Sequence, residues 1–124
     1  MSDATVSTSE LLSGAYTACT AHVIAVVGEE IHRDLLASSR EAVLPYVPPL
    51  KAITARNGSL AIAEAGDREV FAVAMWLQQY LREIRAFMVG IPPFDVRDLT
   101  ADIREDLAAV GFYDYFEQAQ DLKY

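Results

Sequence analysis

The chain has 124 residues, of which 52% are hydrophobic and 10% are aromatic, so it can bury the core of one domain. Ten Lys and Arg residues against 18 Asp and Glu residues give a formal net charge of −8, which argues against nucleic-acid binding and against an anionic membrane surface. The single cysteine, Cys19, excludes an intramolecular disulfide and a zinc site made of several cysteines. We expect no membrane insertion, because no apolar run approaches the ~20 residues that a bilayer span needs. The acidic, polar start does not resemble a secretory signal, so an intracellular, cytoplasmic domain is expected.

Residues 1–20 are expected to form an N-terminal tail that can hold a short helix. Ser7 and Glu10 have the spacing of a capping box, which predicts a helix that begins near Ser9. Gly14 weakens this segment, because glycine inside a helix costs about 1 kcal/mol relative to alanine. The folded domain is then expected to span residues 21–124.

The run over residues 22–27 is apolar and β-branched and ends at Gly28, a pattern typical of a buried strand. Residues 31–33 can return as the hairpin partner of that strand. Asp34 is a good N-cap and predicts a short helix after it. A second short helix is expected over residues 40–46, where a proline-rich stretch stops it.

Asn57-Gly58 is the strongest turn signal in the chain and predicts a hairpin between residues 51–56 and 59–64. With a two-residue turn, the predicted cross-strand pairs are Arg56 with Ser59, Ala55 with Leu60, Ile53 with Ile62 and Lys51 with Glu64. The alternative is that Asn57-Gly58 ends a short helix through a left-handed residue.

Three helices are predicted in the second half of the chain. Apolar residues recur at helical spacing after Asp67, which predicts a long helix. A second helix, capped by Asp98 or Thr100, is expected to end at Gly111, and a last short one spans residues 114–122. The fold class is therefore α+β (or α/β), with a small mixed sheet of about three strands packed with five or so helices.

Few residues suggest chemistry. Glu29 and His32 have the Glu-x-x-His spacing of di-iron helical bundles, but that site needs a continuous helix, and Gly28 argues for a turn there. His22 and Cys19 are the remaining candidates for nucleophilic catalysis. Nucleophile elbows, phosphate loops and dinucleotide fingerprints are missing from the sequence. We therefore predict no enzyme, and no catalytic, cofactor-binding or metal-ligating residue.

Aromatic residues are concentrated in a set that is either a binding surface or part of the core. The set comprises Trp76, Tyr80, Phe112, Tyr113, Tyr115 and Phe116. Aromatic side chains at helical spacing are more often buried, which favours the core.

Four short motifs occur in a particular order along residues 21–120. They are Val26-Val27-Gly28-Glu29-Glu30-Ile31 with Leu35, Asn57-Gly58-Ser59-Leu60-Ala61-Ile62, Asp67 with Phe71, and Ala109-Val110-Gly111-Phe112-Tyr113. This order resembles a BTB/POZ domain of the potassium-channel-tetramerisation (KCTD-like) type. In that family the first motif follows an apolar strand and usually has Phe where Ile31 stands here. The family's Asp-Arg-Asp motif is reduced to Ala65-Gly66-Asp67.

The resemblance implies a protein-protein interaction domain that homo-oligomerises, as a dimer or as a ring of four or five copies. It further implies a scaffold or adaptor role, for instance toward a cullin-type ubiquitin ligase. The expected partners are thus the chain itself and a cullin-type scaffold or another protein, with no cofactor and no nucleic acid. One alternative is a monomeric, mainly helical module that binds one heterologous protein. The other is a metal- or cofactor-dependent enzyme built around Glu29, His32 and His22.

Overall fold

The computed structural model describes residues 7–56, 59–62, 65–87 and 95–120, and these residues are mostly helical. The elements are α1 (Thr8–Val27), α2 (Glu29–Val43), the 3-10 helix η1 (Pro48–Ala52), β1 (Thr54–Arg56), β2 (Ser59–Ala61), α3 (Asp67–Phe87), α4 (Val96–Leu99), the 3-10 helix η2 (Ala101–Ile103), α5 (Arg104–Ala109) and α6 (Phe112–Gln120). The broad α+β class is confirmed, with helix predominant. The described residues form one two-stranded antiparallel sheet where about three strands were expected.

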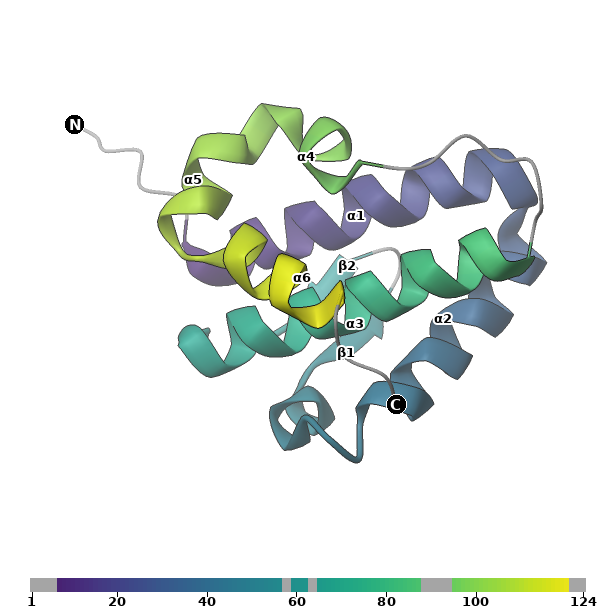
Figure 1. Ribbon diagram of the computed structural model, residues 1–124, viewed down its shortest axis with the longest axis horizontal. Helices are drawn as coiled ribbons and strands as arrows, with labels where there is room; N and C mark the ends of the chain where they lie inside the picture. The colour runs from purple at the N-terminus through teal and green to yellow at the C-terminus, as the bar shows by residue number, and fades with distance from the viewer. Residues whose placement is uncertain (1–6, 57–58, 63–64, 88–94, 121–124) are drawn as a thin grey trace.

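Helix α3 is the centre of the fold, as its sequence periodicity predicts. It packs against α1, α2, α6 and η1 (Figure 1). Its buried side chains lie on all sides of the helix, because neighbours cover it from several directions. Trp76, Tyr80 and Leu77 are among its fully buried residues.

Helix α1 replaces two of the predicted elements. The predicted start is confirmed: the Ser7 hydroxyl oxygen accepts the Glu10 backbone N–H at 3.2 Å. The helix then continues to Val27, so the predicted strand over residues 22–27 is wrong. Buried side chains recur every three or four residues as far as Val23, and this packing outweighs the strand preference of the β-branched residues.

The predicted boundary between residues 20 and 21 lies inside α1. Leu11, Leu12 and Cys19 are buried in the main core, so residues 8–20 are part of the packed domain rather than a tail. Gly14 does not end the helix, because its missing side chain has a packing role. A Cβ atom at this position would lie 3.1 Å from Cδ1 of Ile103, so glycine allows η2 to approach α1 closely.

Helix α2 replaces the predicted return strand and both predicted short helices. Gly28, with φ 89°, separates α2 from α1 in a conformation that glycine adopts easily. Helix α2 therefore begins at Glu29, whereas the first predicted helix of this region begins only after Asp34. It ends at Val43, two residues before Pro45. The helix buries His32, Ser39 and Val43, and it packs chiefly on α3.

The predicted hairpin register is confirmed over the described residues. Thr54 pairs with Ala61, Ala55 with Leu60, and Arg56 with Ser59. The strands are shorter than predicted, because Lys51 and Ala52 belong to η1. The turn residues Asn57 and Gly58 and the predicted partner Glu64 lie outside the described residues.

The C-terminal segment keeps the predicted order of helices but shifts their starts. Asp95 caps α4, accepting the Arg97 backbone N–H at 2.9 Å, in place of the predicted Asp98 or Thr100. Gly111, with φ 83°, follows α5 at the predicted end, and α6 begins at Phe112 rather than at Asp114. The core interpretation of the aromatic set is confirmed, because all its members except the partly buried Tyr115 are buried.

Candidate functional site

Several polar and titratable side chains meet in the core between α1, α2 and α3. His32 Nδ1 lies 2.7 Å from the Tyr80 hydroxyl, and the two rings meet edge to face. Trp76 Nε1 donates to the Ser39 hydroxyl at 3.1 Å. The Tyr16 ring lies 5.7 Å from the Trp76 ring, measured between centroids. The two hydrogen bonds join α2 to α3, and the ring contact joins α1 to α3. Among the described residues, no buried side-chain N or O atom lacks a hydrogen-bond partner.

Burial keeps this cluster uncharged near neutral pH. It raises the pKa of the Cys19 thiol to about 12. The pKa of Tyr80 is also raised, mainly by burial and further by the neighbouring Tyr16 and Cys19. Thiolate and phenolate forms are therefore disfavoured here, and the observed role of the cluster is to hold the helices together.

The predicted metal-binding spacing lies on a helix, although a turn was expected there. Glu29 and His32 are both in α2, but the His32 ring is turned toward Tyr80. His22 lies partly buried on α1. Within the described part of the chain, no three or more His, Cys, Asp or Glu side chains are grouped to hold a metal ion.

His32 is expected to make stability depend on pH. Burial lowers its pKa below 6.5, and Arg33 adds to this effect while Glu29 opposes it. Its contribution should be complete above about pH 6.5 and should be lost as the pH falls from there through the folded-state pKa, because the unfolded chain then binds the proton more readily. Denaturation at about pH 7.5 and about pH 5.5 measures this loss. His32→Gln should reduce it, and an equal loss in this variant and in the wild type would contradict the assignment.

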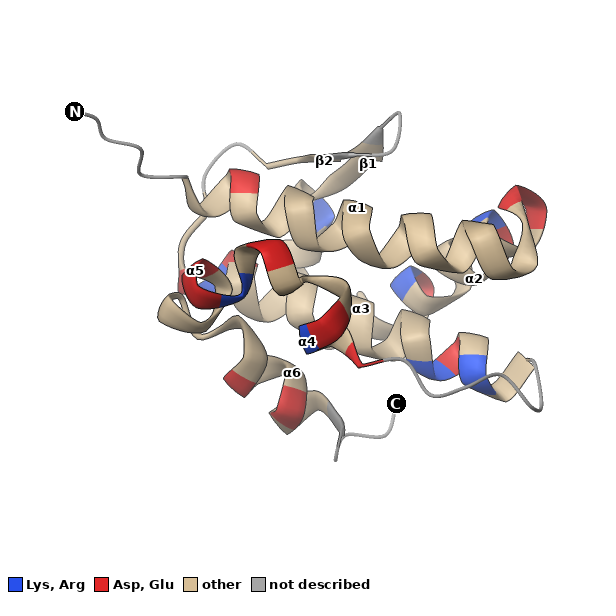
Figure 2. Cartoon of the chain, turned by 90° about the horizontal axis from the view of Figure 1, so that it is seen from above, with Lys and Arg blue, Asp and Glu red and all other residues tan. Residues whose placement is uncertain are grey.

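The most unusual surface of the molecule is one side of α1, which we name the α1 outer face. It consists of Thr17, Ala21, Ile24 and Ala25, all exposed or partly exposed. These residues lie opposite the buried side of the helix at 100° per residue. Between Glu10 and Glu29 the sequence holds no Asp, Glu, Lys or Arg, and in Figure 2 the helix is uncharged along this whole length.

A helix that is apolar or small on all sides is normally buried on all sides. Helix α1 is buried toward the core, and Ile103 of η2 packs against Gly14, but the outer face from Thr17 to Ala25 stays exposed or partly exposed. On this face the sequence and the environment disagree. By length and composition α1 could also cross a membrane, which corrects the expectation that no apolar run is long enough. The core helix of a globular protein passes the same test. The sequence prediction missed this apolar helix because it divided residues 8–27 into a short helix and a strand.

Comparisons with family models, with curated proteins and with solved structures find no match to this chain. The first motif of the BTB/POZ resemblance, which follows a strand in that family, lies at the junction of α1 and α2. The second motif overlaps β2, and the Asp67 motif opens α3. The resemblance stays a prediction, and the geometry of α1 has to be interpreted by itself.

Proposed function

We propose that the protein is an interaction module that self-associates through the α1 outer face. The observation that carries the proposal is the exposed side of a helix that holds no Asp, Glu, Lys or Arg after Glu10. Burying such a surface against protein removes apolar area from water. The surface has small side chains at Ala21 and Ala25, which permit another helix to approach closely.

Charge favours a second copy at this face over other ways of pairing two chains. Each chain carries a formal charge of −8, so two copies repel one another at most orientations. Two unit charges 4 Å apart cost about 1 kcal/mol even in water. Contact along α1 brings together the longest stretch of sequence that lacks charged residues, and the repulsion there is smallest.

The size of the face favours a weak dimer rather than a permanent ring. From Thr17 to Ala25 the α1 outer face extends over nine residues, or about 14 Å of helix. A strip about 10 Å wide then offers roughly 140 Å² per copy, or about 280 Å² in total, against the roughly 1,200 Å² or more of stable complexes. We therefore propose a dimer that forms and dissociates with concentration.

A protein surface fits this face better than a membrane does. Helices that bind membrane surfaces usually combine large apolar side chains with flanking Lys and Arg. Here the side chains are mostly small, and the flanking charges are Glu10, Glu29 and Glu30. Anionic lipid repels such flanks. A scaffold or adaptor role then follows from pairing two copies, and the link to a cullin-type ligase stays a prediction.

Ala21→Glu tests the proposal, because Ala21 is exposed at the middle of the α1 outer face. Light scattering of the wild type should show a mass that rises from one chain toward two as the concentration rises. The variant should stay monomeric, since two buried carboxylates would face each other across the dimer. The matched control is Ala37→Glu, an equal charge change at an exposed position of α2.

Four outcomes of this experiment are informative. Loss of dimer in Ala21→Glu alone supports the proposal, and equal loss in both variants would assign the effect to net charge. A wild type that is monomeric throughout would overturn self-association. Wild-type sedimentation with neutral phosphatidylcholine vesicles, lost in Ala21→Glu, would overturn it in favour of a membrane surface.

The second candidate is a monomeric helical module that binds one heterologous protein. The observation that favours it is the helical structure of residues 22–27, where the BTB/POZ resemblance requires a strand. A monomer in the light-scattering experiment would make this the better account.

A further inference from the structure

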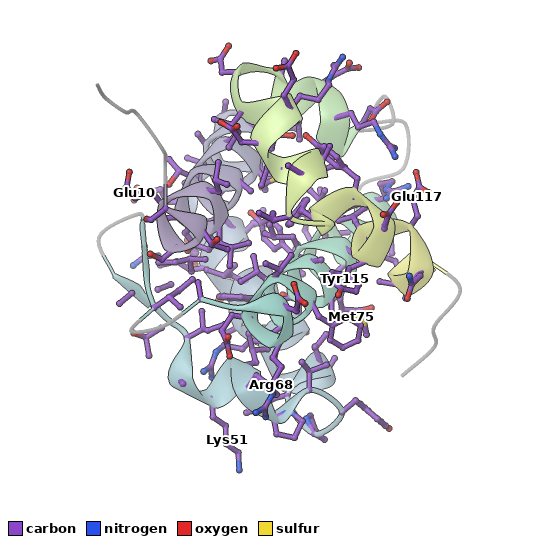
Figure 3. All side chains as sticks on the ribbon, turned by 90° about the vertical axis from the view of Figure 1, so that its left-hand side faces the viewer. Glu10, Lys51, Arg68, Met75, Tyr115 and Glu117 are labelled. Carbon is purple, nitrogen blue, oxygen red and sulfur yellow. The ribbon has the colours of Figure 1, made fainter. Side chains whose placement is uncertain are left out.

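A groove of about 610 Å³ lies between the first turns of α1 and the hairpin. It is lined by Ser9, Glu10 and Ser13 of α1 and by Thr54, Leu60 and Ile62 of the hairpin segment, among others. The volume is in the range of about 300–1,000 Å³ that is usual for ligand sites. Figure 3 looks onto this end of the molecule, where the Glu10 side chain extends outward from α1.

One edge of β2 faces this groove. The Leu60 backbone N–H donates to the Ser13 hydroxyl oxygen at 3.1 Å, so this edge is turned toward α1. The N–H and C=O of one strand residue point to the same edge, which places the Leu60 carbonyl there too. Backbone groups of alternate residues in a strand point to the same edge, so the Ile62 N–H, two residues further along, points there as well. Among the described residues, neither the Leu60 carbonyl nor the Ile62 N–H has a hydrogen-bond partner.

An open carbonyl and an open N–H two residues apart are the pair that one residue of an added parallel strand uses. That residue donates its own N–H to the carbonyl and accepts the N–H with its own carbonyl. Adding an extended peptide to a free sheet edge is a recurring mode of recognition. Ser13 already satisfies Leu60 N–H, so it fixes the position of the edge without occupying the open pair.

The charge of the groove selects among peptides. The backbone N–H of Glu10 is used in the cap of α1, while its carboxylate forms no ion pair with any described residue. This carboxylate is exposed in a chain that carries a formal net charge of −8. A Lys or Arg side chain is therefore the complementary group, and Asp or Glu is disfavoured.

We propose that this groove binds an extended, basic peptide segment of a partner protein by strand addition to β2. One peptide residue pairs with the Leu60 carbonyl and the Ile62 N–H, and a neighbouring Lys or Arg reaches Glu10. The site is separate from the α1 outer face and does not depend on self-association. A dimer formed through the α1 outer face would hold two such grooves, one in each chain.

A random library of acetylated, amidated hexapeptides provides the probe. Peptides retained by the immobilised wild-type chain should be enriched in Lys and Arg at one position and depleted in proline, which lacks the N–H that a strand needs. A retained peptide should also slow hydrogen exchange of the Ile62 amide several-fold. Glu10→Gln should weaken its binding about two- to fivefold, as expected for an exposed ion pair.

Glu30→Gln is the matched control, because Glu30 is also an exposed acid in the first turn of a helix. It should leave peptide binding unchanged. An equal effect of both variants would mean that Glu10 acts only through the net charge of the chain and does not contact the peptide. A retained pool without basic enrichment, or protection confined to amides of the α1 outer face, would overturn the site. Ala21→Glu should dissociate a dimer yet retain peptides, so the two proposals can fail independently.

Discussion

Replacing Leu12 by alanine is expected to lower the free energy of unfolding by about 2–5 kcal/mol. The Leu12 side chain is fully buried in the main core, although its position was predicted to lie in a tail. Removing it deletes apolar contacts and leaves a cavity that the surrounding helices fill only in part. Urea denaturation followed by circular dichroism measures the change.

Val26→Ala is the control for this result, because Val26 is on the same helix and is exposed. Its effect should stay within about 0.5 kcal/mol, the usual range for surface substitutions. A loss below about 1 kcal/mol in Leu12→Ala would mean that residues 8–20 are not packed against the domain. Loss of self-association in Leu12→Ala would follow unfolding, so stability and mass should be measured on the same sample.

Replacing Tyr80 by phenylalanine is expected to cost about 1–3 kcal/mol, because the buried His32 ring loses a hydrogen-bond partner. The volume of the side chain barely changes, so a packing defect contributes little. The same denaturation experiment reports the loss, and it should be measured above about pH 7, where His32 is neutral in both states.

A double-mutant cycle separates this hydrogen bond from other effects of the substitution. His32→Leu removes the other partner, and the double variant with Tyr80→Phe leaves no unpaired group of this pair in the core. The double variant should be more stable than the sum of the two single losses predicts. Strict additivity would show that the 2.7 Å contact contributes no coupling to stability.

The sequence predicted well where local signals and tertiary packing agree. The capping box at Ser7 gave the start of α1, the regular spacing after Asp67 gave α3, and Asn57-Gly58 gave the register of the hairpin. Gly111 marked the end of α5 because a left-handed residue there is easy for glycine. In each case the signal lies within a few residues of the feature.

The errors fell where a distant contact decides the local structure. The β-branched run at 22–27 favours strand by itself, but it continues the buried side of α1 that Leu12, Tyr16 and Cys19 begin. Gly14 suggested a weak helix, because the residue that packs against it, Ile103, is 89 positions away and the contact is not visible in the sequence. Gly28 suggested a hairpin turn, and it is instead the joint between two helices.

The candidate surfaces divide in the same way. The charge-free stretch from Leu11 to Gly28 is visible in the sequence, but only as one helix does it become a continuous face. The groove at β2 is not visible there, because Ser13 and Leu60 meet only when α1 packs beside the hairpin. The same packing makes Leu60 and Glu10 line one groove.

The sequence by itself determined the acidic charge, the capacity for one core, the central helix α3 and the hairpin pairing. These follow from composition and from patterns that repeat over a few residues. Only the tertiary structure decided that residues 8–27 form one helix, that His32 pairs with Tyr80, and which side of α1 stays exposed. The physical reason is that burial is a property of the assembled helices, and its free energy exceeds the local preferences of about 1 kcal/mol or less per residue.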